Sequence, residues 1–210
     1  MKKLSAALVA LCLSTPVFAA DLANGEKINR SCALCHGAYG QGAPGKLSPR
    51  IAGMPKYYLI KAIKDYRDGV RSYPLMNKTS GLDQMTESDI EDISAYLAAI
   101  DLSSDARFNI GPPDTGDVDA GEELYLDECK VCHNKDGYGK ERKEAPPLAG
   151  QHPAYLYTVM KGFQAKSRIH DNDPEDETFL EYSDEEIINL SAHLAAEFAP
   201  KVRVNAVAPS

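Results

Sequence analysis

The sequence is short of positive charge, of cysteine and of long apolar runs. Its 210 residues include 23 Lys and Arg against 31 Asp and Glu, a formal net charge of −8 at pH 7. Nucleic acids and anionic membranes attract basic proteins, so this balance argues against both as partners. A basic patch on a redox partner protein suits the chain better, although a surplus of carboxylates also serves solubility alone. Beyond the N-terminal region no apolar run is long enough to span a membrane, so we expect no integral membrane segment after processing.

The N-terminal region is typical of a secretory signal peptide. Lys2 and Lys3 precede an apolar run at residues 4–13, and Val17-Phe18-Ala19 resembles a cleavage site. The apolar run is short for a membrane span. We therefore expect residues 1–19 to be removed and the mature chain to be periplasmic.

Cysteine is scarce, and its few positions form a pattern. One of the five cysteines, Cys12, lies in the predicted signal peptide, which leaves four and no spare thiol. All four belong to a Cys-x-x-Cys-His motif that occurs twice, as Cys32-Ala33-Leu34-Cys35-His36 and as Cys129-Lys130-Val131-Cys132-His133. This motif is typical of c-type haem attachment. Its two thiols can add to the vinyl groups of one haem, and the His that follows can bind the iron.

Two other chemistries use closely spaced cysteines. A redox-active dithiol does not need the His that follows each pair, and a zinc site would need its ligands brought together by the fold. Two complete motifs in an exported chain favour haem, because c-type haem is attached outside the cytoplasm. The sequence therefore predicts two c-type haems, with His36 and His133 as iron ligands.

The two motifs belong to a longer internal repeat. At an offset of 97 residues, without gaps, many positions carry the same residue, which indicates a duplicated domain. Matching positions include Gly40 and Gly137, Pro49 and Pro146, Arg71 and Arg168, Tyr58-Leu59 and Tyr155-Leu156, and Leu97-Ala98-Ala99 and Leu194-Ala195-Ala196. We expect a first domain at residues 20–102, a linker at 103–117, a second domain at 118–200 and a tail at 201–210.

Helical patterns account for both copies, and no stretch convincingly predicts a strand. Helices are expected before each motif, at residues 23–33 and 119–131, and in the middle of each copy, at 55–68 and 153–165. The last helix of each copy starts with a capping-box pattern, Thr86 with Asp89 and Ser183 with Glu186. Each copy has only about 80 residues, which is small for a core of its own, so a covalent haem would supply much of the apolar volume.

These residues resemble the class I cytochromes c, and in particular the two-haem cytochrome c4 proteins. Beyond the motifs, the resemblance rests on Pro49-Arg50-Ile51-Ala52-Gly53 followed by Tyr58-Leu59, and on Met85-Thr86-Glu87-Ser88-Asp89-Ile90 leading to Ala95-Tyr96-Leu97. It implies an all-α fold of two tandem class I cytochrome c domains, each wrapped around a covalent haem. It also implies that the first helix crosses the last, with Gly25 against Tyr96 in the first copy.

The resemblance further implies how each axial His is held. In this family, the carbonyl of a Pro after the haem motif accepts the outer N–H of the axial His. This would assign Pro49 to His36 and Pro146 to His133. Such a bond fixes the ring orientation and makes the ligand more basic.

The family places a Met ligand in the loop between the middle and last helices. Met76 lies in this loop and is the expected sixth ligand of the first iron. Met54 is too close to the start of the middle helix. Met85 occupies an apolar position just before the last helix, but it stays an alternative because the spacing from Met76 to that helix is slightly longer than usual.

The second copy departs from this pattern, because Asp173 stands where the first copy has Met76. Its single Met, Met160, aligns with Ile63 inside the middle helix and is expected to pack in the core. His170 lies in the ligand loop three residues earlier, and it is the expected second ligand of the second iron. The alternative is an open or water-bound iron.

The two other histidines of the second copy are expected to have structural roles. His152, beside Pro153 at the start of the middle helix, is expected at the surface or as a cap. His193 aligns with Tyr96 and is expected to pack on the first helix near Gly121.

Residues 171–177 include five carboxylates, which usually indicates a solvated loop. Beside a haem, these charges would stabilise the oxidised iron. Together with two His ligands, they predict that the second haem has the lower potential. A potential step between two haems favours electron flow in one direction.

These features predict a periplasmic electron-transfer protein rather than an enzyme. The resembled family implies a donor dehydrogenase and an acceptor such as a terminal oxidase or a reductase. The alternative is an enzyme acting at an open second haem on peroxide or on a small sulfur or nitrogen compound, although no spare thiol or acid–base cluster supports it. A third class is a dedicated haem subunit of a larger dehydrogenase.

Overall fold

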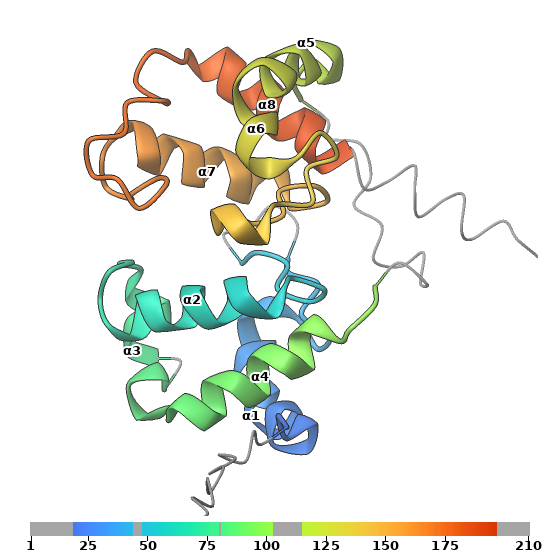
Figure 1. Cartoon of the computed structure of the whole chain (residues 1–210), viewed down its shortest axis with the longest axis vertical. Helices are drawn as coiled ribbons and strands as arrows, with labels where there is room; N and C mark the ends of the chain where they lie inside the picture. Colours follow the sequence, from blue (N-terminus) through green and yellow to red (C-terminus); the bar gives the residue numbers. More distant parts are fainter. Residues whose placement is uncertain (1–18, 44–47, 80, 103–114, 197–210) are drawn as a thin grey trace, which may run out of the picture.

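The chain folds into two helical halves that are stacked along the longest axis of the molecule (Figure 1). The structure is a computed structural model and describes residues 19–43, 48–79, 81–102 and 115–196. Within these ranges the regular structure is helical, with two isolated β-bridges and no strand, so the expected all-α fold of two tandem domains is confirmed. None of the helices in these ranges combines the length and the apolar character needed to cross a membrane. The predicted signal peptide, linker and tail lie almost entirely outside the described residues.

In the first half, the three predicted helices are present as α1 (Leu22–His36), α2 (Lys56–Arg67) and α4 (Glu87–Ala98). α1 continues through the haem motif and ends at its His. Two short helices, α3 (Pro74–Thr79) and η1 (Leu82–Gln84), occupy the segment that was expected to be a loop. Thr86 caps α4 and exchanges hydrogen bonds with Asp89, so the predicted capping box is present.

The second half repeats this order with one irregular segment. α5 (Val118–Leu124), η3 (Tyr125–Cys129) and α6 (Lys130–His133) follow one another directly and correspond to α1. η3 is a π-helical turn, a feature that often occurs at functional sites. η4 (Glu141–Lys143) lies in the next loop, and α7 (Pro153–Gln164) and α8 (Asp184–Ala196) correspond to α2 and α4. Ser183 and Glu186 exchange hydrogen bonds before α8, as predicted.

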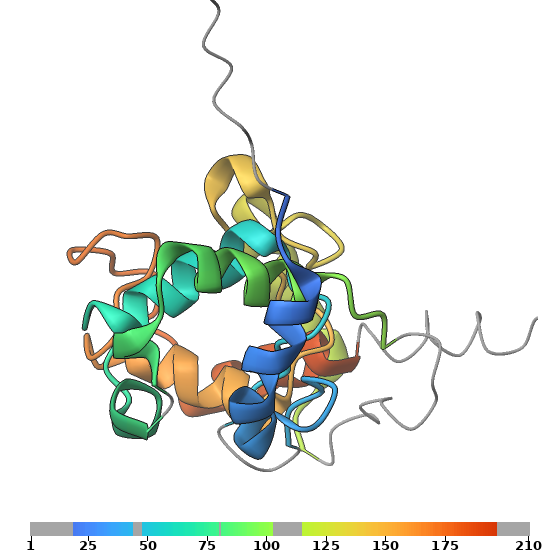
Figure 2. The same ribbon diagram turned by 90° about the horizontal axis from the view of Figure 1, so that it is seen from below.

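In each half the first helix crosses the last helix at a glycine. Figure 2 shows α1 lying against one end of α4. A Cβ atom on Gly25 would lie 2.4 Å from the carbonyl oxygen of Asp92 and 2.6 Å from Cβ of Tyr96. A Cβ atom on Gly121 would lie 2.9 Å from Cβ of His193. The expected contacts of Gly25 with Tyr96 and of His193 with Gly121 are therefore confirmed, and only glycine permits this close approach.

Each half buries its own apolar cluster. The cluster of the first half contains Met54, Leu59, Ile93 and Leu97, and that of the second contains Tyr125, Leu156, Met160, Phe179, Ile187, Leu190 and Leu194. Met160 is 7% exposed, so its expected place in the core is confirmed. The first Cys of each motif, Cys32 or Cys129, is partly buried against the cluster of its own half. A group attached to these thiols would extend the apolar packing of a small core.

Buried hydrogen bonds join the two halves. The backbone N–H of Arg50 donates to Oε1 of Gln151, and Nε2 of Gln151 donates to the carbonyl oxygen of Arg50, both at 2.9 Å. At a second point, the hydroxyl of Tyr57 donates to the carbonyl oxygen of Ala145 at 3.0 Å. Side chains of both halves therefore hold them in one arrangement.

The expectation for His152 is wrong. This residue precedes α7 but its side chain caps nothing, and it is 2% exposed. Its Nε2 lies 2.9 Å from the carbonyl oxygen of Gln41, in the other half. His152 matches Pro55 in the repeat, and that match does not predict a contact with Gln41, because the contact depends on how the two halves meet.

Filling either helix crossing should destabilise the protein. We expect Gly25→Ala and Gly121→Ala each to lower the free energy of unfolding by about 1–3 kcal/mol, because the new methyl group meets backbone that cannot move away cheaply. Gly162→Ala is the matched control. It lies within α7 with its nearest contact at 3.5 Å, so it should be neutral or slightly stabilising. Denaturant titration of the haem-loaded protein, followed by circular dichroism, measures all three. Wild-type stability in both crossing variants would show that the helices can separate without cost.

Candidate functional site

Each haem motif ends with a buried histidine. α1 ends at His36, which is 7% exposed, and Gly37 (φ 80°) turns the chain away from the helix. Nδ1 of His36 lies 2.8 Å from the carbonyl oxygen of Pro49. In the second half His133 is 9% exposed, and its Nδ1 lies 2.9 Å from the carbonyl oxygen of Pro146. The structure thus brings together the same two groups in both halves.

This contact determines the tautomer of both imidazoles. A carbonyl oxygen can only accept, so Nδ1 carries the proton and Nε2 keeps its lone pair. Burial lowers the pKa of His36 and His133, although the bond to the proline carbonyl acts in the opposite direction. Both side chains are therefore neutral at pH 7, with Nε2 available as a metal donor.

The loop after each motif is tied back to the histidine. The backbone N–H of Gly42 donates to the carbonyl oxygen of His36 at 2.7 Å, and that of Gly139 donates to the carbonyl oxygen of His133 at 3.0 Å. Both glycines have positive φ, at 78° and 79°, a conformation that favours glycine. These bonds bring each loop back toward the proline that accepts from the imidazole.

The surroundings of the thiols distinguish between covalent haem, a redox dithiol and a zinc site. Burial raises the pKa of the Cys32 thiol and raises that of Cys129 to about 11. A redox dithiol needs the opposite shift, because the thiolate is the reactive form. Among the described residues, no three or more His, Cys, Asp and Glu side chains are grouped to hold a metal ion, so zinc finds no ligand set there. A pair of thiols, of which the first packs against an apolar cluster, followed by a neutral buried His, fits covalent haem.

The three candidate methionines of the first half lie in different surroundings. Met54 is 3% exposed in the apolar cluster, and Met85 packs against the same cluster. Met76 lies in α3 and is partly buried. The side chain of Asn77 anchors this helix by accepting from the backbone N–H of Tyr73 at 2.6 Å. Met76 is therefore presented by an ordered segment between α2 and α4.

In the second half a tight turn replaces α3. His170 and Asp173 pair as an isolated β-bridge, with Asp171 (φ 50°) and Asn172 (φ 56°) between them. Two successive residues with positive φ are typical of a type I′ turn, in which Asp and Asn are favoured. His170 is therefore the first residue of the turn that follows α7, and Asp173, which matches Met76 in the repeat, is the last.

His170 contacts two aromatic rings and a carboxylate within the second half. Its ring centroid is 5.0 Å from that of Phe163 and 5.1 Å from that of Phe179, and its Nδ1 is 3.3 Å from Oδ1 of Asp176. Its side chain is 26% exposed. Beyond the larger effect of burial, the charge of His170 also lowers the pKa of His133. The two imidazoles are therefore electrostatic neighbours.

A polar cluster at the junction of the halves was not predicted. The Arg71 guanidinium lies 5.7 Å from the centroid of Tyr58, and Arg168, from the other half, bonds to Tyr155. Burial raises the pKa of Tyr155 to about 12. Burial also acts to raise that of Tyr58, but the two guanidinium groups bring it below its ordinary value. These cations could hold the carboxylates of haem propionates. Their matching positions in the repeat were the signal that could have identified them.

Comparison with known proteins supports the same interpretation. The model of the Cytochrome c family matches residues 22–101 and 118–196. Cytochrome c4 of Pseudomonas aeruginosa is 31% identical over 163 residues, covering 74% of this chain and 77% of that protein. The thiosulfate dehydrogenase electron acceptor of Stutzerimonas stutzeri is 30% identical over 187 residues, covering 81% and 82%. The crystal structure of reduced recombinant cytochrome c4 from Pseudomonas stutzeri has a TM-score of 0.70 at 28% identity, covering 85% of this chain and 99% of that one.

Proposed function

Because the chain belongs to the cytochrome c family, as a two-haem member similar to cytochrome c4, we propose that it carries single electrons in the periplasm from a donor dehydrogenase to an acceptor such as a terminal oxidase or a reductase. One observation carries this proposal: a neutral, buried imidazole, fixed by a proline carbonyl, follows each pair of thiols. Haem iron supplies the one-electron chemistry, and the protein controls its potential and access. The name of one relative, thiosulfate dehydrogenase electron acceptor, supports a dehydrogenase as the donor.

The residues of the two motifs are assigned to two haem sites. The first comprises Cys32, Cys35 and His36, and the second comprises Cys129, Cys132 and His133. Pro49 and Pro146 orient the imidazoles, and by accepting the outer N–H they make each ring a better donor to iron.

Met76 is assigned as the sixth ligand of the first iron. Its place in α3, outside the apolar cluster that contains Met54 and contacts Met85, supports this choice. A thioether opposite a histidine raises the potential of a haem.

His170 is assigned as the sixth ligand of the second iron. Its electrostatic effect on the pKa of His133 and its place in the tight turn support this choice. Two imidazoles favour ferric iron more than one imidazole and a thioether do, and the carboxylates of residues 171–177 act in the same direction. The second haem therefore has the lower potential, and an electron passes downhill from the second half to the first.

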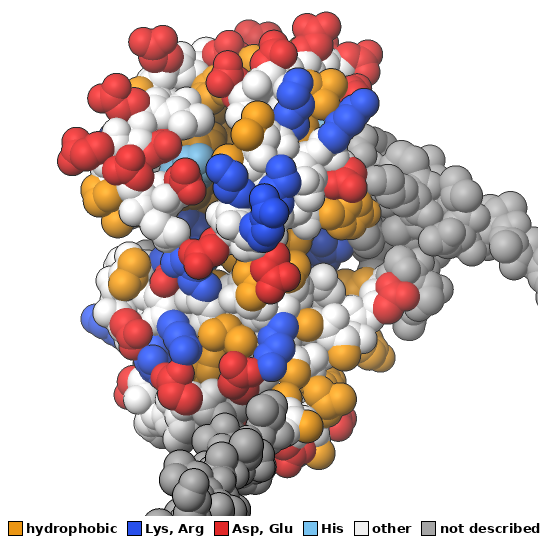
Figure 3. Space-filling model, viewed as in Figure 1, with side chains coloured by type: hydrophobic (Ala, Val, Ile, Leu, Met, Phe, Trp, Pro, Cys, Tyr) orange, Lys and Arg blue, Asp and Glu red, His pale blue; other side chains and the backbone are white. Residues whose placement is uncertain are grey.

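The surplus of negative charge supports entry of electrons at the second half. Residues 118–200 contain 18 Asp and Glu against 8 Lys and Arg, whereas residues 20–102 contain 10 of each. Carboxylates cover the upper end of the second half in Figure 3. A donor with a basic patch is steered toward this half, and it meets the haem of lower potential there.

The competing function is an enzyme that uses an open second haem on peroxide or on a small sulfur or nitrogen compound. The replacement of a Met ligand by Asp173 is the observation that favours it. The electrostatic effect of His170 on the pKa of His133 opposes it, and a test of His170 decides between the two functions.

Removal of the proposed thioether should affect the first haem alone. We expect Met76→Ala to abolish the far-red sulfur-to-iron absorption band of the oxidised protein and to lower one potential, because the ligand that raises it is gone. Met85→Ala is the matched control and should keep the band. Loss of the band in the control, and not in Met76→Ala, would transfer the assignment to Met85.

Removal of the proposed imidazole should open the second haem. We expect His170→Ala to convert one low-spin ferric haem into a high-spin species that binds cyanide, while the far-red band is unchanged. His193→Tyr, which introduces the residue of the matching position in the first half, should keep both haems low-spin. Electron paramagnetic resonance measures both variants. An unchanged spectrum for His170→Ala would refute the ligand and favour the enzyme.

The charge of the second half should control electron uptake. We expect reduction by hexaammineruthenium(II), a cation, to slow by about tenfold as salt is raised from low to high concentration, because screening weakens attraction. Glu175→Gln with Glu177→Gln should reduce this salt dependence, whereas Glu26→Gln with Asp83→Asn, which removes the same charge from the first half, should preserve it. Stopped-flow absorbance measures the rates. Equal effects of the two pairs would contradict entry at the second half.

A further inference from the structure

One of the contacts between the two halves lies where the repeat breaks. Gln151 and His152 occupy the positions that hold Met54 and Pro55 in the first half, and Arg50 matches a proline in the second. All three are polar and deeply buried: Arg50 is 8% exposed, Gln151 4% and His152 2%. Burial of such groups is costly unless they are hydrogen-bonded, so their partners indicate their role.

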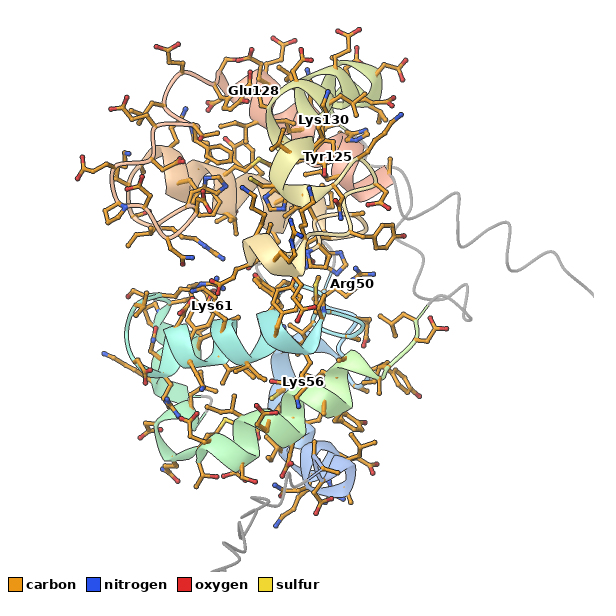
Figure 4. All side chains as sticks on the ribbon, in the orientation of Figure 1. Arg50, Lys56, Lys61, Tyr125, Glu128 and Lys130 are labelled. Carbon is orange, nitrogen blue, oxygen red and sulfur yellow. The ribbon has the colours of Figure 1, made fainter. Side chains whose placement is uncertain are left out.

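Arg50 and Gln151 form a closed pair across the junction. The side-chain amide of Gln151 accepts from the backbone N–H of Arg50 and donates to its carbonyl oxygen, both at 2.9 Å. Nη2 of Arg50 also donates to the carbonyl oxygen of Ala149 at 3.2 Å. Figure 4 shows Arg50 at the junction of the two halves. Three hydrogen bonds thus connect Arg50 of the first half to Ala149 and Gln151 of the second.

This pair connects the two segments that hold the axial histidines. Arg50 directly follows Pro49, whose carbonyl accepts from the first axial histidine. Ala149 lies three residues after Pro146, whose carbonyl accepts from the second. The chain between these bonds is short. A shift of one half against the other must therefore either break the pair or displace a carbonyl that orients an axial ligand.

His152 ties the second half to the same loop. Nε2 of His152 lies 2.9 Å from the carbonyl oxygen of Gln41 and must carry the hydrogen. Burial and the charge of Arg50 lower the pKa of His152, although the bond to Gln41 raises it, so the ring is neutral. Gly42, which follows Gln41 in the chain, donates its backbone N–H to the carbonyl oxygen of His36. A Cβ atom on Gly42 would lie 2.5 Å from Nε2 of His152, which shows how closely the loop and the ring pack.

We infer that Arg50, Gln151 and His152 are positioning residues for electron transfer between the two haems. They hold the loop of the first axial histidine against the segment that follows the second, and so keep the distance and path between the irons constant. This inference rests on the proposed electron-transfer function. None of the three needs to touch a haem. Their departure from the repeat makes the two domains one rigid unit instead of two carriers joined by a linker.

The test is Gln151→Met, which introduces the residue of the matching position and keeps the side-chain length. It removes both hydrogen bonds to Arg50 and also the bond that Oε1 accepts from the backbone N–H of His152. We expect the docked arrangement to lose about tenfold in population against separated domains. In pulse radiolysis of the oxidised two-haem protein, a single injected electron should then pass more slowly between the haems. In calorimetry, one unfolding transition should separate into two. The ligand bands of both haems should remain those of the wild type.

Gln164→Met is the matched control. Nε2 of Gln164 donates to the carbonyl oxygens of Phe179 and Tyr182, at 3.1 and 2.7 Å, entirely within the second half. This variant loses these two bonds and the one that Oε1 accepts from Nζ of Lys161, so it should weaken the second domain. It should leave the rate of transfer between the haems unchanged, because the junction is intact.

A second variant, His152→Phe, keeps an aromatic ring at this position but removes the hydrogen bond to Gln41. It tests the inference independently if Gln151→Met fails to fold. Transfer between the haems at the wild-type rate in the folded variants would overturn the inference. If the wild type itself shows no transfer between haems, the proposed function fails instead. Calorimetry distinguishes this failure from a failure of the junction itself: two transitions in the variants would show that the three residues hold the domains together, and one transition would overturn that role as well.

Discussion

The hydrogen bond from Nδ1 of a buried histidine to a proline carbonyl is the interaction on which the rest of the structure depends. It can form only if a helix ends at the histidine and the following loop returns to it, and both conditions hold for His36 with Pro49 and for His133 with Pro146. The helix crossing at Gly25 holds the first of these helices against α4. Burial keeps each ring neutral, and the bond fixes the proton on Nδ1, so that in each half Nε2 is available as a donor.

The two halves share this arrangement and differ in what lies between the middle and last helices. The first half has α3 with Met76, and the second has a tight turn with His170 beside five carboxylates. A duplicated domain thus gives two irons with similar attachment and different surroundings. Ligand type and local charge are the terms that set a haem potential, and in the proposed assignment both terms differ in the same direction. The surplus of acidic residues in the second half supports the proposal that a basic donor docks there.

Local patterns predicted most of the fold. The capping boxes at Thr86 and Ser183, the helix periods and the Cys-x-x-Cys-His spacing depend on neighbours in sequence, and all of these have the predicted form. The buried place of His152 and the pairing of Arg50 with Gln151 could not be predicted, because they depend on how two domains meet. The turn after α7 was predicted only in part. The missing Met implied a different loop, but Asp171 and Asn172 were not identified from the sequence as the central residues of a turn.

The central claim is that one chain carries two haems with different axial ligands and unequal potentials. Spectroelectrochemical titration of the purified wild-type protein tests this claim most directly. Stepwise reduction should consume two electrons per chain in two resolved steps. The far-red sulfur-to-iron band should disappear entirely in the step at higher potential, with both haems low-spin throughout. Loss of the band in the step at lower potential, or in equal parts in both steps, would contradict the assignment of ligands and the direction of electron flow.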